Sequence, residues 1–136
     1  MENKAVILNK FESLERCINR INEEFQNDSN NLNNITKADA IMLNLQRACQ
    51  LVMDTANYVV ASRNLGITQS NKDAFEILFK NNLISKEMLD NMKGMIGFRN
   101  IAVHDYQEID EEILIDVLVN HLQDLQEFIR QMLNLE

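Results

Sequence analysis

The sequence predicts an all-α fold, a bundle of four long helices and one short helix in a single domain over residues 1–136. Proline is absent and glycine occurs only three times, whereas an all-β fold needs many tight turns built from these residues. Apolar residues recur at alternating spacings of three and four along most of the chain, which is the period of helices with one buried face. The hydrophobic fraction of 46% is typical of a globular protein.

The N-terminal half is expected to hold two of the long helices. Apolar residues between positions 7 and 25 form a heptad stripe, and the polar run 26–34 should be an exposed loop. The second helix is predicted to begin at Thr36, whose hydroxyl would cap it while Asp39 reaches back. This helix carries a wide apolar arc and is expected to end at Gly66 in the left-handed conformation.

Three further helices are predicted in the C-terminal half. A short helix should start near Asn71, and Ser85 should cap a methionine-rich helix that follows it. Asp110 should cap the last helix, whose first turn carries two glutamates where the helix dipole favours negative charge. The apolar surface of the second and the methionine-rich helix exceeds what one small bundle should cover. We therefore predict a two-fold homodimer.

The composition limits the classes of partner. With a net charge of −8 and a pI near 4.7, the chain is not expected to capture DNA or RNA broadly, so any RNA chemistry needs a small local site. No apolar stretch is long enough to span a membrane, and the N-terminus does not resemble a signal peptide. Cys17 and Cys49 show no metal-ligand spacing and are expected to be reduced core residues of a cytoplasmic protein. No cofactor motif is present, and two histidines leave few possibilities for a metal site.

Chemistry-bearing side chains concentrate between residues 97 and 106. Arg99, Asn100, His104, Asp105 and Tyr106 lie within eight positions. The arginine can bind phosphate oxygens as a fork, the histidine can move a proton near neutral pH, and the tyrosine adds a hydroxyl. Asp105 could orient His104 or cap a turn. Together these groups can bind a phosphodiester and stabilise developing charge without a metal ion.

Helix geometry constrains how the motif can act. On a straight helix, Arg99 and His104 lie about 140° apart, whereas Arg99 and Tyr106 are nearly in register two turns apart. Arg99 and His104 can meet at one phosphate if the helix frays near Val103, or if two subunits each supply part of the site. Both possibilities stay open from the sequence.

Two other polar side chains are candidate members of the site. Asp54 on the second helix could face the site or a neighbouring helix. His121 lies on the apolar stripe of the last helix, where a lone histidine is most often a satisfied core or interface residue.

The pattern Arg99-x4-His104-x-Tyr106 resembles the Arg-x4–6-His motif of the HEPN superfamily, in the form found in its HepT-like toxin branch. Asn100 occupies the position where this family commonly has a polar residue. The order of segments over most of the chain is also similar, and the motifs of a nucleotidyltransferase are absent. The resemblance therefore points to the toxin of a toxin–antitoxin pair and not to its partner.

The resemblance implies a metal-independent endoribonuclease in which two subunits bring their motifs together in a dimer cleft. In this interpretation His104 transfers protons, Arg99 holds the phosphate, and Asn100 and Tyr106 position the RNA backbone. It further implies a nucleotidyltransferase antitoxin that silences the toxin by transferring AMP to Tyr106. The alternative is a non-catalytic helical module that partners a nucleotidyltransferase and uses the motif to bind nucleotides.

Overall fold

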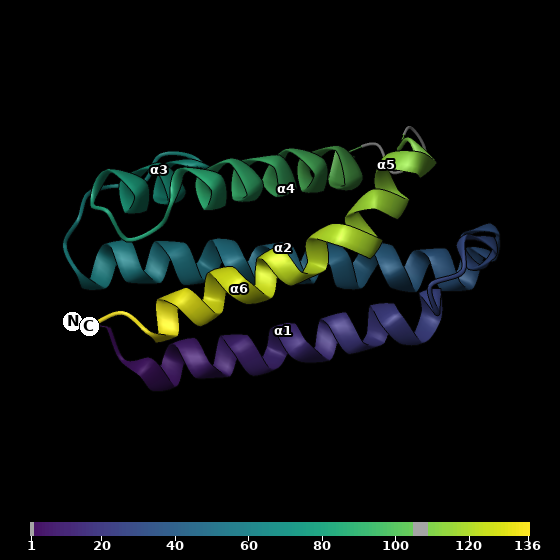
Figure 1. Cartoon of the computed structure of the whole chain (residues 1–136), viewed down its shortest axis with the longest axis horizontal. Helices are drawn as coiled ribbons and strands as arrows, with labels where there is room; N and C mark the ends of the chain where they lie inside the picture. Colours follow the sequence, from purple (N-terminus) through teal and green to yellow (C-terminus); the bar gives the residue numbers. More distant parts are fainter. Residues whose placement is uncertain (1, 105–108) are drawn as a thin grey trace.

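The computed structural model describes residues 2–104 and 109–136, and every regular element in these ranges is a helix (Figure 1). The elements in chain order are α1 (Lys4–Phe25), the 3₁₀ helix η1 (Ser29–Asn33), α2 (Ile35–Ser62), α3 (Asp73–Lys80), α4 (Lys86–His104), α5 (Glu111–Asp116), the π-helical turn η3 (Val117–His121) and α6 (Leu122–Leu133). Because α5, η3 and α6 follow one another without a break, they form one long bent helix. The predicted all-α bundle of four long helices and one short helix is therefore confirmed.

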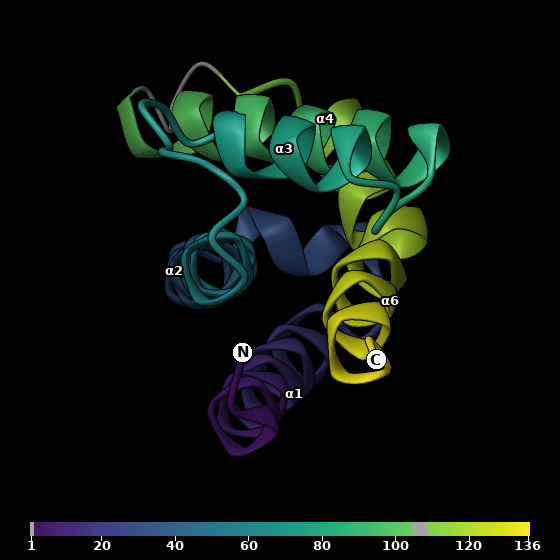
Figure 2. The ribbon, with the colours of Figure 1, turned by 90° about the vertical axis from the view of Figure 1, so that its left-hand side faces the viewer.

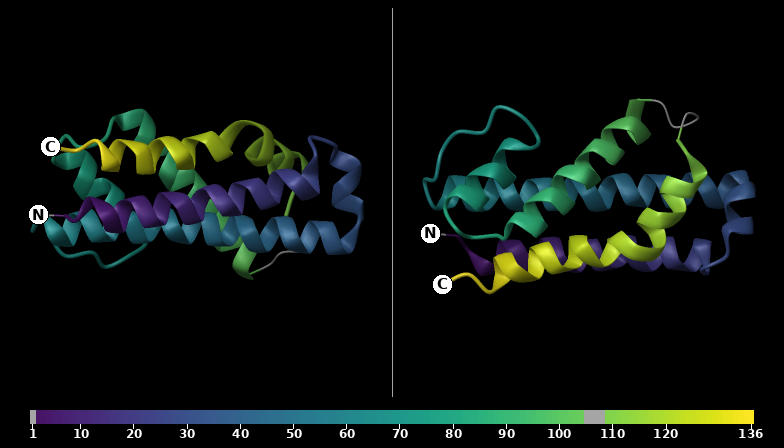
Figure 3. Two further views of the ribbon diagram at one scale, coloured as in Figure 1. Left: turned by 90° about the horizontal axis from the view of Figure 1, so that it is seen from below. Right: turned by 45° about the horizontal axis from the view of Figure 1, so that its top comes forward.

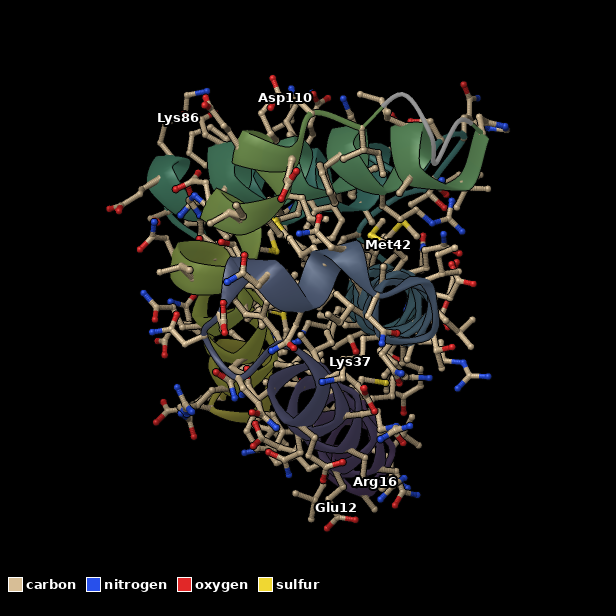
Figure 4. The ribbon with its side chains drawn as sticks, turned by 90° about the vertical axis from the view of Figure 1, so that its right-hand side faces the viewer. Glu12, Arg16, Lys37, Met42, Lys86 and Asp110 are labelled. Atoms are coloured by element: carbon tan, nitrogen blue, oxygen red, sulfur yellow. The ribbon has the colours of Figure 1, made fainter. Side chains whose placement is uncertain are left out.

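The helices pack in layers around one apolar core. α1 packs against both α2 and α6, and α3 and α4 form a further layer across α2 and α6 (Figures 2 and 3). The core joins these layers, and the rings of Phe75 on α3 and Phe128 on α6 lie 5.1 Å apart between centroids. Figure 4 shows Met42 lying between α2 and the layer of α4 and α5, whereas Glu12 and Arg16 point outward from α1.

The two termini lie side by side at one end of the bundle (Figure 1). Arg63, the residue directly after α2, donates hydrogen bonds to both carboxylate oxygens of Glu2, at 2.8 and 2.6 Å. It also donates to the main-chain carbonyl of Glu136 at 3.0 Å. One guanidinium therefore ties both ends of the chain to α2.

The residues predicted to begin and to end α2 were both wrong. The helix is capped by Asn34 and not by Thr36, because the Asn34 side chain accepts a hydrogen bond from the backbone N–H of Lys37 at 3.1 Å. Asparagine is as good a cap as threonine or better, and here it stands two residues earlier. At the other end, Asn64 and not Gly66 adopts the left-handed conformation, with φ of 55°. Asparagine tolerates this conformation better than most residues do.

Other local predictions hold. The Ser85 hydroxyl accepts a hydrogen bond from the N–H of Met88 at 3.0 Å, and the Asp110 carboxylate accepts one from Glu112 at 2.8 Å, so both caps are confirmed. The run 26–34 is mostly exposed as expected, but part of it forms η1. Cys17 and Cys49 are buried and free. Within residues 2–104 and 109–136, no helix is both long and apolar enough to cross a membrane.

Candidate functional site

The motif lies at the C-terminal end of α4. Arg99, Asn100 and His104 occupy its last two turns, whereas Asp105 and Tyr106 lie outside the described residues. The helix continues through Val103 to His104, so the fraying that could have brought Arg99 and His104 to one phosphate does not occur. In one chain the two side chains therefore leave α4 in different directions.

Arg99 is half-buried against α2. Its Nη2 donates to Oε1 of Gln50 at 3.1 Å, and its Nη1 donates to Oδ1 of Asn100 at 3.4 Å. Gln50 in turn donates from Nε2 to Oδ1 of Asp54 at 2.8 Å. Asp54 therefore belongs to the surroundings of the site, but it reaches Arg99 only through Gln50.

The guanidinium of Arg99 is not fully satisfied. Its Nε is buried and has no hydrogen-bond partner among the described residues. Leaving a buried donor unpaired costs about 1–3 kcal/mol. The guanidinium carries five N–H donors, and Nη1 and Nη2 each use one of them in the hydrogen bonds to Asn100 and Gln50. Their other N–H groups are available to an anion.

Cys49 lies beneath this arginine but is not a candidate nucleophile. Burial raises the pKa of its thiol to about 12, and the positive charge of Arg99 opposes that rise only in part. Since the thiolate is the reactive form of cysteine, Cys49 is inert near neutral pH.

A second cation stands on the other side of α4. The Nζ of Lys72 lies 3.9 Å from the point that a Cβ at Gly97 would occupy. Gly97 and His104 are seven residues apart on a continuous helix, so they share a face. The described part of the site therefore places Arg99 on the α2 side of α4, and Lys72 on the same side as His104.

Apolar side chains are exposed beside the motif. Leu43 on α2 and Ile101 and Val103 on α4 have exposed fractions of 47%, 54% and 44%. Leu43 and Val103 also line a pocket of about 290 Å³ between these two helices. Next to them, the Gln46 side chain donates to the main-chain carbonyl of Ala102 at 3.4 Å.

His121 takes no part in this arrangement. It lies in η3, where Nδ1 is 2.9 Å from Oδ2 of Asp124 and Nε2 is 3.0 Å from Oδ2 of Asp116. The hydrogen bond with Asp124, joined by that with Asp116, raises the pKa of the imidazole above its usual value. The expectation of a satisfied histidine is confirmed, although the side chain is 37% exposed and so is not a core residue.

The sequence interpretation missed Gln50, Gln46 and Lys72. A signal for the first two existed, because Gln46, Gln50 and Asp54 follow one another at intervals of four and so form a polar stripe along one side of the helix. No pattern along the chain pointed to Lys72. Among the described residues, no three histidine, cysteine or acidic side chains are arranged so that they could hold a metal ion.

Comparison with known proteins gives consistent matches. The sequence model of the family described as ribonuclease HepT-like matches residues 11–132. The mRNA nuclease HepT of Shewanella oneidensis is 44% identical over 124 residues, which are 91% of this chain and 93% of that protein. A solved structure of the tri-AMPylated Shewanella oneidensis HEPN toxin in complex with MNT antitoxin has a TM-score of 0.87 and 42% identity, covering 96% of this chain and 97% of that one. A toxin–antitoxin crystal structure with AMP-PNP has a TM-score of 0.89 and 41% identity, covering 97% and 99%.

Proposed function

The chain belongs to the HepT-like ribonuclease family and is a ribonuclease toxin; we propose that it cleaves RNA without a metal ion, through Arg99 and His104. The observation that carries the proposal is the state of Arg99, whose guanidinium is held by two neutral acceptors, the side chains of Gln50 and Asn100. Its positive charge has no carboxylate partner among the described residues. His104 is exposed five residues further along the same helix. A phosphate-binding cation and a proton carrier are the two groups that metal-free RNA cleavage requires.

In the proposed reaction, His104 takes the proton from a ribose 2′-hydroxyl. The 2′-oxygen then attacks the adjacent phosphorus, and the bond to the 5′-oxygen of the next nucleotide breaks as that oxygen receives a proton. Arg99 holds the phosphate and offsets the negative charge that grows on its oxygens in the pentacovalent state. Asn100 and Tyr106 position the RNA backbone, and Asp105 orients His104 or caps a turn.

The proposed active form is a homodimer. In one chain Arg99 and His104 leave α4 in different directions, and a second copy supplies the missing partner for each. The exposed apolar side chains of Leu43 and Val103 lie beside the motif and line one pocket, and exposed apolar patches are typical of interfaces between proteins. Burying them between two copies of α4 would bring the Arg99 of one subunit and the His104 of the other to one phosphate, where water supplies the proton that the leaving 5′-oxygen receives.

The proposed partner in the cell is a nucleotidyltransferase antitoxin that transfers AMP to Tyr106. Support comes from the similar solved structure, in which an AMPylated toxin is bound to its MNT antitoxin. A phosphodiester on the tyrosine would add negative charge and a bulky nucleoside to the motif, and these would compete with the RNA phosphate for Arg99. The alternative of a purely non-catalytic module is not favoured, because the curated relative is an mRNA nuclease.

Substitution of His104 tests the proposed chemistry, and the other histidine of the chain is its matched control. His104→Ala should lower the rate of RNA cleavage by about 10²–10⁴-fold, the usual contribution of a general acid or base. His121→Ala should keep cleavage, because His121 is held by two aspartates away from the motif. Wild-type cleavage should be unchanged in EDTA. Equal cleavage by His104→Ala and wild type would overturn the proposed site, and loss of activity in EDTA would overturn the metal-free mechanism.

A further inference from the structure

Gln50 lies between the motif arginine and a carboxylate. Its Oε1 accepts a hydrogen bond from Nη2 of Arg99 at 3.1 Å, and its Nε2 donates to Oδ1 of Asp54 at 2.8 Å. Both contacts are made by one side-chain amide on α2, and one of them crosses to α4. The amide is thus the described polar link between Asp54 and the guanidinium.

The two contacts fix the direction of the amide. A guanidinium only donates hydrogen bonds, so it needs the oxygen end of Gln50, and an ionised carboxylate only accepts, so it needs the NH₂ end. A flipped amide would lose both contacts at once. Asp54 therefore holds the Gln50 oxygen toward Arg99 without touching Arg99.

The Gln50 side chain that contacts the Arg99 guanidinium carries no charge. A glutamate at this position would pair with Arg99 and cancel the charge that the RNA phosphate needs. Glutamine supplies a hydrogen-bond acceptor for orientation and leaves the positive charge uncompensated. The second acceptor of Arg99, the Asn100 side chain, is neutral as well.

We propose that Gln50, oriented by Asp54, is a positioning residue that fixes the Arg99 guanidinium for the scissile phosphate while leaving its charge free. The inference rests on the proposed role of Arg99 in RNA cleavage. Gln50 itself touches no reacting atom, and its effect passes through the direction of the arginine side chain.

Two substitutions at Gln50 separate orientation from charge. Gln50→Leu removes the acceptor but keeps the charge of Arg99, so the single-turnover cleavage rate should fall about tenfold or more while RNA binding changes little. Gln50→Glu pairs Arg99 with a carboxylate, so binding should weaken. The dependence of log K on log salt should then become less steep by about 0.7, the value for one phosphate contact on a single strand.

The role of Asp54 is tested by its coupling to Gln50. Asp54→Leu should slow cleavage, whereas Asp54→Asn should keep most of the rate because its side-chain oxygen can still accept from Gln50. In the Gln50→Leu background, Asp54→Leu should cause no further loss, since residues that act through one link are not additive.

The experiment measures cleavage of a fluorescent RNA oligonucleotide and binding of its 2′-O-methyl analogue, which lacks the attacking hydroxyl. The matched control is Gln126→Leu on α6, because the Gln126 amide also donates to a carboxylate, that of Glu15 at 2.9 Å on α1, and makes no contact with Arg99. Thermal unfolding of each variant confirms that it is folded. A merely structural role for Gln50 would alter stability without changing the salt dependence of binding in Gln50→Glu.

The outcomes distinguish this inference from the proposed function. If wild type cleaves, His104→Ala does not, and Gln50→Leu cleaves as fast as wild type, the positioning role is wrong while the proposed function stands. An unchanged salt dependence in Gln50→Glu would also overturn it. If His104→Ala cleaves as fast as wild type, the proposed site fails and this inference fails with it.

Discussion

Replacement of Arg63 by methionine would test how the two ends of the chain are held to the bundle. Arg63 makes a bidentate ion pair with Glu2 and a further hydrogen bond to the Glu136 carbonyl. The Arg63 and Glu2 side chains are only 13% and 4% exposed. Methionine keeps much of the length and apolar stem of arginine, so the variant removes chiefly the charge and its donors.

The expected loss in the free energy of unfolding follows from the burial of the Glu2–Arg63 ion pair. Exposed ion pairs contribute less than about 1 kcal/mol, whereas removing one partner from a buried pair costs about 3–5 kcal/mol. The Glu2–Arg63 pair is well covered but lies at the end of the bundle, so we expect the free energy of unfolding to fall by about 2 kcal/mol. For a chain of this length that change corresponds to a decrease in Tm of about 7 °C.

The effect should depend on pH, since the hydrogen bond from Arg63 lowers the pKa of the Glu2 carboxyl below its ordinary value of 4.5. A depressed pKa in the folded state gives stability that is fully present above the unfolded pKa and is lost as the pH falls through the folded pKa. The Tm difference between wild type and Arg63→Met should therefore be largest near pH 7 and smaller near pH 3. Part of the Tm difference should persist near pH 3, because Arg63 also donates to the Glu136 main-chain carbonyl, which does not titrate.

Thermal unfolding of wild type, Arg63→Met, Glu2→Gln and the double variant measures the coupling between the two residues. We expect the double variant to be no less stable than Arg63→Met, because the unpaired carboxylate is gone. A Tm difference that is the same at both pH values, or a Tm of Arg63→Met close to that of wild type near pH 7, would refute the reasoning.

Three further predictions follow from individual residues. Tyr106→Phe should keep appreciable toxicity but escape a co-expressed cognate nucleotidyltransferase and gain no AMP by intact mass; equal silencing of both forms with no mass change would contradict the modification. His121→Gln should lower Tm below about pH 6.5 but not at alkaline pH, because a raised folded pKa gives stability that is lost as the pH rises through it; a pH-independent effect would contradict this. Cys49 should resist thiol reagents in the native protein and react after denaturation, since burial raises its pKa to about 12, and rapid native modification would be inconsistent with that burial.

Much of the fold could be predicted from the sequence because helix periodicity and helix caps are local signals. The caps at Ser85 and Asp110 act within three residues of themselves. The start of α2 could not be fixed in the same way, because Asn34 and Thr36 are both competent caps and only the three-dimensional structure decides between them. The π-helical turn η3 was also missed. Apolar residues continue at spacings of three and four across it, and this pattern does not show the extra residue of the wider turn.

For the candidate site too, residues close together in the sequence could be predicted, whereas contacts between distant positions could not. The motif residues Arg99 and His104 are close in sequence and could be recognised together. The contact between Arg99 and Gln50 joins positions 49 residues apart and exists only because α4 crosses α2 at this point. The proximity of Lys72 to Gly97 likewise depends on how the segment before α3 approaches α4. The sequence therefore indicated the chemistry, but packing determined which neighbours hold it.

The most direct test of the central claim is cleavage by mixed dimers of Arg99→Ala and His104→Ala. Each variant alone should be nearly inactive. If one site takes Arg99 from one subunit and His104 from the other, a mixed dimer holds one site with both substitutions and one intact site. After denaturation and refolding of equal amounts of both variants, about a quarter of wild-type activity should therefore return. Failure of the refolded mixture to cleave RNA, with wild type treated in the same way fully active, would contradict a site shared between two subunits.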